Sequence, residues 1–372
     1  MQKIGILGGG QLGRLLLQAA INYPVETYIL EDDPNCPAGH LCHHFIKGDF
    51  KNFENVYAFG KGLDAITIEI ESVNADALQK LKDEGVRVYP DPATLKTIQN
   101  KILQKEFYAK HNIPTAEFIT TTTQSELNEH IEFLPAIHKL AEGGFDGRGV
   151  VDITNASLIS QGFNEPAVLE KKINISKEIS VIIGVNDSGG TSTFPPVEMI
   201  FDTQLNVLNY QLSPADLDLQ ALLDIKAIAN NVVNNLKSPG IFAVEMFIDT
   251  EGRILVNETA VRVHNSGHHT IEANYISQFD MLWRIMLGLP MDNLQAVMPS
   301  AMINIIGETM EANDINKMRS ILKVENTFIH IYGKNAGRAG RKMGHVTILH
   351  TERDTLIKNV QRVREILKSK SE

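Results

Sequence analysis

The first 95 residues alternate short β-rich runs with helical patterns, and this alternation restricts the fold more than any other feature of the sequence. The β-rich runs lie at residues 3–7, 26–30, 44–49, 64–70 and 87–89, and the clearest helical patterns lie at 11–21 and 74–84. Strands joined through helices pair in parallel, because a parallel pair needs a long crossover connection. We therefore predict an N-terminal parallel-sheet domain over residues 1–95.

The pattern changes after the two prolines of Tyr89-Pro-Asp-Pro92. A long helix is predicted from Thr94 to Lys110, followed by hairpin-like strand runs and one helix over residues 214–236. After Pro299 the tail reads as strand, helix, strand, strand and helix. The chain is therefore predicted to combine α/β and α+β parts, with a central domain over 96–300 and a small C-terminal α+β domain over 301–372.

Composition excludes several classes of protein. With 372 residues, 43% of them hydrophobic, the chain can bury a substantial core. The formal charge of −10 disfavours a nucleic acid or an anionic membrane as the main partner, so an anionic substrate would need local cationic pockets. No apolar run approaches the roughly 20 residues that cross a bilayer. The only cysteines, Cys36 and Cys42, could close one small loop, and we expect a reducing cytoplasm.

A glycine fingerprint, Gly8-Gly-Gly-Gln-Leu-Gly13, follows the first strand and begins the first helix, and Glu31, Asp32 and Asp33 follow roughly twenty residues later. Three interpretations stay open. The motif could bind a nicotinamide or flavin dinucleotide, form only a tight strand-to-helix turn, or contact another phosphate or substrate at a helix N-terminus. The last interpretation is favoured.

A second glycine-rich segment runs from Gly143 to Gly149 and contains Asp146 and Arg148. Its backbone N–H groups could close over a polyphosphate, with the nearby Lys139 as a point charge. The alternative is an ordinary glycine-rich hairpin.

Two apolar strand patterns each carry a carboxylate, Glu245 in one and Glu258, beside Asn257, in the other. Paired inward carboxylates with an adjacent amide suit Mg²⁺, which takes oxygen ligands. Alternatively, each acid could face solvent or pair with a surface lysine.

Two polar segments are candidates for binding anions. The first contains Arg262 and His264 and precedes a predicted helix; zinc binding is disfavoured there, as it is for the cluster of Cys36, His40, Cys42, His43 and His44, because the spacings fit no familiar zinc site. The second places four basic residues in nine positions, Gly337-Arg-Ala-Gly-Arg-Lys-Met-Gly-His345, after Lys334. It suits a substrate phosphate, with a solvated hairpin as the alternative.

These motifs, taken in order, resemble the N5-carboxyaminoimidazole ribonucleotide synthetase family of the ATP-grasp superfamily. The resemblance runs nearly end to end and rests on Gly8–Arg14, Glu69–Val73, Gln99–Lys101, the glycine flap, Asn257-Glu258, His264–His268 and Gly340–His345. It implies an ATP-grasp fold whose two lobes hold the nucleotide, between a Rossmann-like N-terminal domain and a small C-terminal domain. It also implies a cytoplasmic enzyme of purine biosynthesis that forms a homodimer.

The implied reaction carboxylates 5-aminoimidazole ribonucleotide with bicarbonate and ATP, through carboxyphosphate, with Mg²⁺ held by Glu245 and Glu258. The catalytic residues implied are Asp146, Arg262, His264 and Lys334. The nucleotide-binding residues implied are Lys101, Lys139, Gly144, Phe145, Asp146, Gly147, Arg148, Gly149, Val150, Glu170, Lys171, Lys172, Ile173, Glu178, Asn257 and Glu258. The substrate-binding residues implied are Gln11, Leu12, Glu71, Asn265, Ser266, His268, Arg341 and Lys342.

Three positions depart from the family pattern: Lys101 replaces an arginine, Phe201 a histidine and Val261 a proline. Other functions stay open beside the implied one. They are another ATP-grasp ligase, such as a formate-dependent glycinamide ribonucleotide transformylase, a nicotinamide-dependent oxidoreductase, and a nucleotide sensor without turnover.

Overall fold

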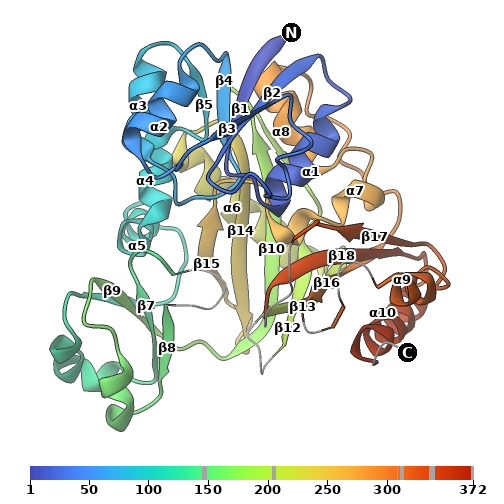
Figure 1. Ribbon diagram of the computed structural model, residues 1–372. Coiled ribbons are helices and arrows are strands. Elements are labelled where there is room, and N and C mark those ends of the chain that lie inside the picture. Colours follow the sequence, from blue (N-terminus) through green and yellow to red (C-terminus); the bar gives the residue numbers. More distant parts are fainter. Residues whose placement is uncertain (145–148, 203–206, 308, 311–313, 335–339, 370–372) are drawn as a thin grey trace.

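The computed structural model describes residues 1–144, 149–202, 207–307, 309–310, 314–334 and 340–369. The chain begins with a parallel five-stranded sheet in the order β3-β2-β1-β4-β5 (Figure 1), which confirms the predicted parallel sheet. Its elements are β1 (Gln2–Leu7), α1 (Gln11–Ala20), β2 (Val25–Glu31), β3 (His44–Lys47), α2 (Phe53–Gly60), β4 (Ala65–Ile68), α3 (Ala75–Asp83) and β5 (Arg87–Tyr89).

The long helix predicted from Thr94 to Lys110 is wrong, because two helices occupy this segment. They are α4 (Pro92–Gln99) and α5 (Lys101–Lys110). Asn100 adopts an extended backbone between them, and its side chain accepts hydrogen bonds from the N–H groups of Ile102 and Leu103. This cap starts a new helix, since an asparagine side chain there satisfies N–H groups that lack a partner within the helix.

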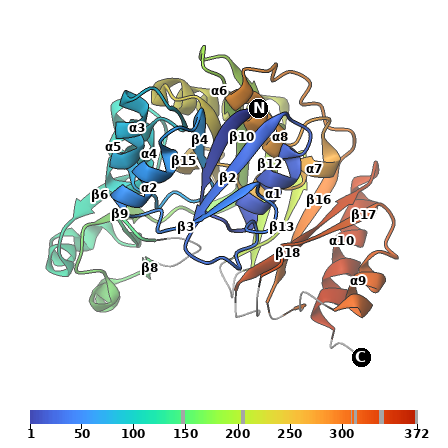
Figure 2. The same cartoon turned by 45° about the horizontal axis from the view of Figure 1, so that its top comes forward.

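A small lobe follows, built on a four-stranded antiparallel sheet in the order β6-β9-β7-β8. It comprises β6 (Phe118–Thr121), the 3₁₀ helix η1 (Gln124–Phe133), β7 (Ala136–Leu140), β8 (Val150–Ile153), the 3₁₀ helix η2 (Ala156–Gln161) and β9 (Ala167–Lys171). In Figures 1 and 2 this lobe and the C-terminal tail lie on opposite sides of the molecule.

The rest of the chain forms a nine-stranded sheet in the order β15-β14-β10-β12-β13-β16-β18-β17, with β11 paired to β10. Its elements up to residue 260 are β10 (Ile175–Val185), β11 (Thr191–Thr193), β12 (Val197–Asp202), β13 (Val207–Ser213), α6 (Leu219–Leu236), β14 (Gly240–Asp249) and β15 (Ile254–Ala260). The later elements are the 3₁₀ helix η3 (Asn265–Gly267), α7 (Thr270–Ala273), α8 (Gln278–Leu287), β16 (Ser300–Ile306), α9 (Ile315–Ile321), β17 (Thr327–Ile331), β18 (Lys342–Leu349) and α10 (Arg353–Lys368). The tail has the predicted order of elements, and its strands extend the central sheet.

Helix α6 begins later than the predicted residue 214, because Asp218 caps it by accepting a hydrogen bond from the N–H of Ala221. Its buried face packs on the β10–β14 side of the large sheet. None of the helices in the described part of the chain combines the length and apolar character that a membrane crossing requires.

Strand alternation on β14 decides which face of the large sheet carries the candidate site. Val244 and Met246 point into the core that contains α6, whereas Ile241 and Ala243 belong to the core that contains α8 and α1. Because successive side chains of a strand point to opposite faces, Glu245 lies on the α8 face. Glu178 and Ser180 of β10 share that face, since Ser180 is paired directly with Glu245.

Candidate active site

The glycine fingerprint is satisfied by the protein's own carboxylates. The N–H of Gly9 donates to Glu31 Oε2, and those of Gly10 and Gly13 donate to Glu69 Oε1 and Oε2, all at 2.9 Å. A Cβ added at Gly10 would lie 2.7 Å from Glu69 Oε1, so these glycines make room for the carboxylates. The bonds to Glu31 and Glu69 leave these three N–H groups no room for a dinucleotide pyrophosphate. The broader expectation of a phosphate or substrate contact at this motif, which includes Gln11 and Leu12, stays a prediction.

A β-bulge brings the metal-ligand candidates to one face. The ladder between β14 and β15 pairs Glu245 with Glu258 and then Met246 with Val256, so Asn257 is the extra residue. In regular alternation Asn257 and Glu258 would point to opposite faces. Here Asn257 and Glu258 accept from two lysines of one cluster, which shows that the bulge brings both side chains to the same site.

The lysine cluster comes from two separate elements. Lys101 of α5 donates to Glu258 Oε2 at 3.0 Å, and Lys139 of β7 donates to Asn257 Oδ1 at 2.9 Å. Lys139 also lies 3.2 Å from Glu170 of β9. The two cations predicted to meet ATP phosphates therefore stand side by side in front of the carboxylates.

Lys105 is a member of this cluster that the sequence analysis missed. Its Nζ lies 3.1 Å from Glu170 Oε2 and donates to Thr115 Oγ1 at 2.6 Å, and its side chain is only 3% exposed. Burial lowers the pKa of Lys105 to about 8, although the charge of Glu170 opposes the shift. The available signal was spacing, because Lys101 and Lys105 are four residues apart on one helix face.

The carboxylates of this site differ strongly in protonation. Burial raises the pKa of Glu245, and the charges of Glu258 and Glu178 raise it further. The Lys101 ammonium instead lowers the pKa of Glu258. Burial raises the pKa of Glu178 to about 7. The repulsion between Glu245 and Glu258 is the kind that a divalent cation relieves.

The donor set fits Mg²⁺. Two carboxylates and one amide lie together, and Mg²⁺ in phosphate-transfer sites is held by one or two carboxylates with substrate phosphates and water. Within the described residues, no group of three or more His, Cys, Asp or Glu side chains could hold a metal. A metal here would therefore depend on the nucleotide phosphates for its remaining ligands.

The segment after β15 places two candidate catalytic residues beside this site. Arg262 Nε lies 3.5 Å from Glu71 Oε1, and His264 Nε2 lies 3.4 Å from Glu245 Oε1. The N–H of Val261 donates to Glu71 Oε1 at 3.2 Å. A proline at this position could not make that bond, so the departure at Val261 adds a donor.

Lys334 of the tail contacts the N-terminal domain at the start of α1. Lys334 Nζ donates to Gln11 Oε1, on the first residue of α1, and to the carbonyl oxygen of Lys342 at 2.7 Å. Lys334 also lies 5.5 Å from the centre of the Tyr332 ring. Two predicted substrate contacts, Gln11 and Lys334, thus meet although 323 residues separate them.

Comparison with known proteins gives the family. Models of the ribonucleotide synthetase preATP-grasp domain, the ATP-grasp domain and the phosphoribosylaminoimidazole carboxylase C-terminal domain match residues 1–99, 106–279 and 300–359. An N5-carboxyaminoimidazole ribonucleotide synthase of Brucella melitensis is 35% identical over 352 residues, which cover 92% of this chain and 95% of that protein. The chain belongs to the N5-carboxyaminoimidazole ribonucleotide synthase family. The predicted family and ATP-grasp fold are thereby confirmed.

Two further relatives match nearly the whole of this chain. A crystal structure of N5-carboxyaminoimidazole synthase from Aspergillus clavatus, in complex with ADP and 5-aminoimidazole ribonucleotide, superposes with a TM-score of 0.90 at 31% identity and covers 98% of both chains. The chloroplastic phosphoribosylaminoimidazole carboxylase of Vigna aconitifolia is 33% identical over 368 residues. The match covers 96% of this chain and 66% of that longer protein.

The nucleotide-binding residues expected from family resemblance lie partly at this site. Gly144, Gly149 and Val150 flank the flap, whereas Phe145, Asp146, Gly147 and Arg148 lie outside the described residues. Glu170 is buried and faces Lys105 and Lys139. Lys171 donates through Nζ to the carbonyl oxygen of Phe133 at 3.0 Å, Lys172 pairs with Asp152, and Ile173 follows β9.

The substrate-binding residues expected from the resemblance differ in their burial and contacts. Asn265 is 7% exposed, and both polar atoms of its amide are buried without a hydrogen-bond partner among the described residues. Ser266 and His268 are fully buried, and Leu12 is 8% exposed. The His268 ring packs near the rings of Phe279, Tyr332 and His345, which makes it part of the support behind the loop. Lys342 is the first residue of β18, and Arg341 directly precedes it.

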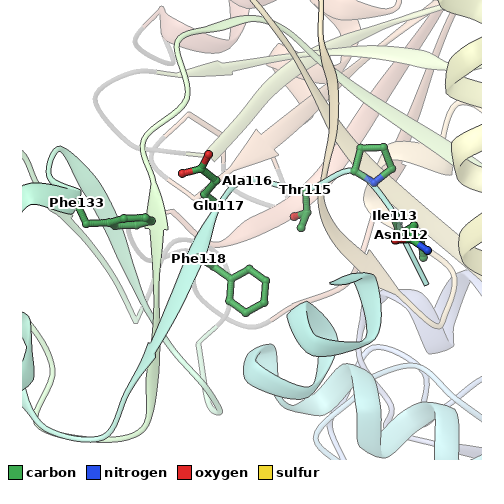
Figure 3. Close-up of a pocket in the computed structure, with 8 residues that line it drawn as sticks. Asn112, Ile113, Thr115, Ala116, Glu117, Phe118 and Phe133 are labelled. Atoms are coloured by element: carbon green, nitrogen blue, oxygen red, sulfur yellow. The ribbon is translucent and has the colours of Figure 1, made fainter. Parts of the chain in front are cut away.

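A wide surface cavity of about 680 Å³, whose lining residues are drawn in Figure 3, includes Thr115, the residue that Lys105 contacts. It is lined by residues 112–118 and Phe133, where the chain passes from α5 into the small lobe. Thr115 connects the cavity to the site, because its hydroxyl accepts from Lys105 and donates to the carbonyl oxygen of Val256 at 2.7 Å. This linker is thus fixed to β15 directly behind Asn257.

Proposed function

We propose that the protein catalyses the ATP-dependent carboxylation of 5-aminoimidazole ribonucleotide by bicarbonate, giving the N5-carboxylated ribonucleotide, ADP and phosphate. Membership in the family supports this activity. The observation that carries the proposal is the convergence of the Glu245–Glu258 pair with Lys101 and Lys139. Phosphoryl transfer requires charge neutralisation and alignment more than a protein nucleophile, and this arrangement provides both.

ATP would lie between the small lobe and the large sheet. Lys101 and Lys139 would exchange their present carboxylate and amide partners for phosphate oxygens. Glu245, Glu258 and Asn257 would hold Mg²⁺, which would neutralise negative charge on the ATP phosphates. Glu170 would hold Lys105 and Lys139 in place from behind, since it contacts both ammonium groups.

Bicarbonate is a poor electrophile, so its carbon must be activated. One of its oxygens attacks the γ-phosphorus of ATP, ADP leaves, and carboxyphosphate forms. Cleavage of the C–O bond then releases phosphate and leaves CO₂ beside the amine of the ribonucleotide. Arg262 and His264 stand next to Glu71 and Glu245, where they would bind the one-carbon anion. Carboxyphosphate would need protection from water, which closure of the Gly144–Val150 flap would give.

The ribonucleotide would bind between the N-terminal domain and the tail. Lys334 already bridges them through Gln11, and with Arg341 it would bind the phosphate of the substrate. Asp146 would contact the substrate amine. A carboxylate can accept a hydrogen bond from that amine and orient it toward the CO₂ carbon.

The proposal includes a homodimer and a cytoplasmic location. The low cysteine content of the chain supports the reducing compartment, and the resemblance to the family supports the dimer. Size-exclusion chromatography with light scattering would test the dimer.

Phosphate release measured with each substrate omitted in turn tests the proposed function. Release should require ATP, bicarbonate and 5-aminoimidazole ribonucleotide together for full rate. Replacement of bicarbonate by formate, and of the nucleotide by glycinamide ribonucleotide, should give no product. Activity with the second pair would indicate the transformylase, and ATP binding with no turnover would indicate a sensor.

A further inference from the structure

Gln278, the first residue of α8, holds the main chain of His264 at both ends. Its Oε1 accepts from the His264 N–H at 2.9 Å, and its Nε2 donates to the His264 carbonyl oxygen at 2.7 Å. Gln278 is fully buried, although a glutamine is mostly exposed in folded proteins. An amide that satisfies both backbone groups of one residue fixes that residue's position and orientation.

The main chain of Gln278 is itself fixed by hydrogen bonds. The N–H of Gln278 donates to Thr270 Oγ1, which donates to the carbonyl oxygen of Gly267 at 2.5 Å. A capping box formed by Ser277 and Asp280 starts α8 at this point. Gly267 has no Cβ where Gln278 packs, since a Cβ there would lie 2.4 Å from Gln278 Oε1. Gly267 therefore leaves the space that the amide of Gln278 occupies.

The same loop sets the tautomer of the His264 ring. The N–H of Ser266 donates to His264 Nδ1, and a backbone N–H can only donate, so Nδ1 must be the acceptor. In the neutral imidazole the proton then lies on Nε2, the atom 3.4 Å from Glu245 Oε1. The ring therefore presents a donor to the site through Nε2.

We propose that Gln278 is a positioning residue that holds His264 so that its Nε2–H points into the site beside Glu245. This inference rests on the proposed function, in which His264 binds the one-carbon anion. In this role His264 donates a hydrogen bond to the anion, and the amine proton goes to another acceptor. Gln278 itself acts through His264, and its Nε2 also lies 3.2 Å from Nδ1 of His268, which supports the same loop.

The first test compares two variants with a matched control. Gln278→Met removes both bonds to His264, and Gln278→Glu keeps the acceptor but replaces the donor by a second oxygen. Both should lower kcat roughly 10- to 100-fold, the usual effect of losing such a supporting contact, with the KM for ATP within about twofold. Gly267→Ala should also lower kcat, because the added Cβ would displace the amide of Gln278 from His264.

Asn274→Asp is the control, because Asn274 is also buried and donates its amide to a main-chain carbonyl, that of Leu294 at 2.9 Å. This variant should keep kcat within about twofold, since its bond lies outside the His264 loop. A folded Gln278→Met with wild-type kcat would overturn the proposal. Equal losses of kcat in Gln278→Glu and Asn274→Asp would overturn it as well.

The second test measures the protonation of the His264 ring and does not depend on catalytic activity. In wild-type protein labelled with ¹⁵N-histidine, the ring of His264, assigned by the loss of its signals in His264→Gln, should show a protonated Nε2 and a bare Nδ1. Protonation of Nδ1 would contradict the inference. If the wild-type protein released no phosphate from ATP with bicarbonate and the ribonucleotide, the proposed function would fail, whereas the ring measurement would still test the tautomer assigned to His264.

Discussion

Replacement of Glu69 by glutamine tests whether the glycine fingerprint serves the fold. Glu69 accepts from the N–H groups of Gly10 and Gly13 at the N-terminus of α1. Each hydrogen bond to a charged acceptor contributes about 1.5–3 kcal/mol, whereas a glutamine oxygen would keep only one bond worth about 1 kcal/mol. The amide NH₂ would face the other N–H, leaving a buried donor unpaired at a cost of about 1–3 kcal/mol. We expect a loss of about 3 kcal/mol for Glu69→Gln, toward which the helix dipole adds a few tenths.

Glu31→Gln provides a matched comparison. Glu31 accepts from the N–H of Gly9 and from that of Asp32, and burial raises its pKa to about 7, so the carboxyl is partly neutral near pH 7. An amide replaces a neutral carboxyl more easily, and we expect a loss of about 1 kcal/mol or less.

Urea unfolding followed by tryptophan fluorescence measures both losses. The single tryptophan, Trp283, is fully buried and donates to the carbonyl oxygen of Leu16 in α1, so its emission reports the packing of α1 on α8. A cost for Glu69→Gln equal to or below that for Glu31→Gln would refute the reasoning. Binding of NADH by either variant or by the wild-type protein would refute it as well.

Three further predictions concern the site and the small lobe. Glu258→Gln should lower Mg²⁺-dependent turnover more than roughly 100-fold, because it removes a ligand charge; a normal magnesium titration would rule out the ligand assignment. Lys334→Met should raise the KM for the ribonucleotide roughly 10- to 100-fold, as loss of a charged hydrogen bond does, with the KM for ATP unchanged in steady-state assays. Burial lowers the pKa of His138 to about 4, so the unfolded chain binds the proton first and stability is lost as the pH falls from 6.5 toward 4. His138→Gln should therefore flatten the pH dependence of the unfolding free energy by up to about 1.4 kcal/mol per pH unit, and an unchanged slope would contradict this.

Local pattern was sufficient for most of the fold. The alternation of strands and helices before residue 90 predicted the parallel sheet, because that pattern has few other solutions. The hydrophobic pattern did not predict the helix boundaries, because a single capping side chain determines where each helix begins. Asn100 splits the helix predicted from Thr94 to Lys110, and Asp218 delays the start of α6, since each caps N–H groups that the apolar periodicity ignores.

The site was predictable only where motifs carry the chemistry. Glu245, Asn257 and Glu258 were found from their strands, yet the bulge that places Asn257 and Glu258 on one face is a matter of register, which the sequence does not display. Lys105 was missed although its spacing from Lys101 was a signal, and Gln278 was missed because no motif marks it. The partners of both residues come from other segments of the chain. Because both side chains are buried, the loss of these contacts would be costly.

The fingerprint shows the opposite case, because its pattern also allowed a dinucleotide, whereas its N–H groups bind carboxylates of the protein itself. A glycine-rich turn at a helix N-terminus favours an anion, and this physical argument holds. The anion is supplied by Glu31, 22 residues from Gly9, and by Glu69, which lies 59 residues from Gly10 and 56 from Gly13. Only tertiary structure could identify it.

Transfer of oxygen from bicarbonate to phosphate tests the central claim most directly. With ¹⁸O-labelled bicarbonate, ATP and 5-aminoimidazole ribonucleotide, attack of a bicarbonate oxygen on the γ-phosphorus predicts one ¹⁸O atom in each phosphate released, read by mass spectrometry. Phosphate whose new oxygen comes from solvent water would contradict the account, since ATP would then be hydrolysed without activation of the one-carbon acid.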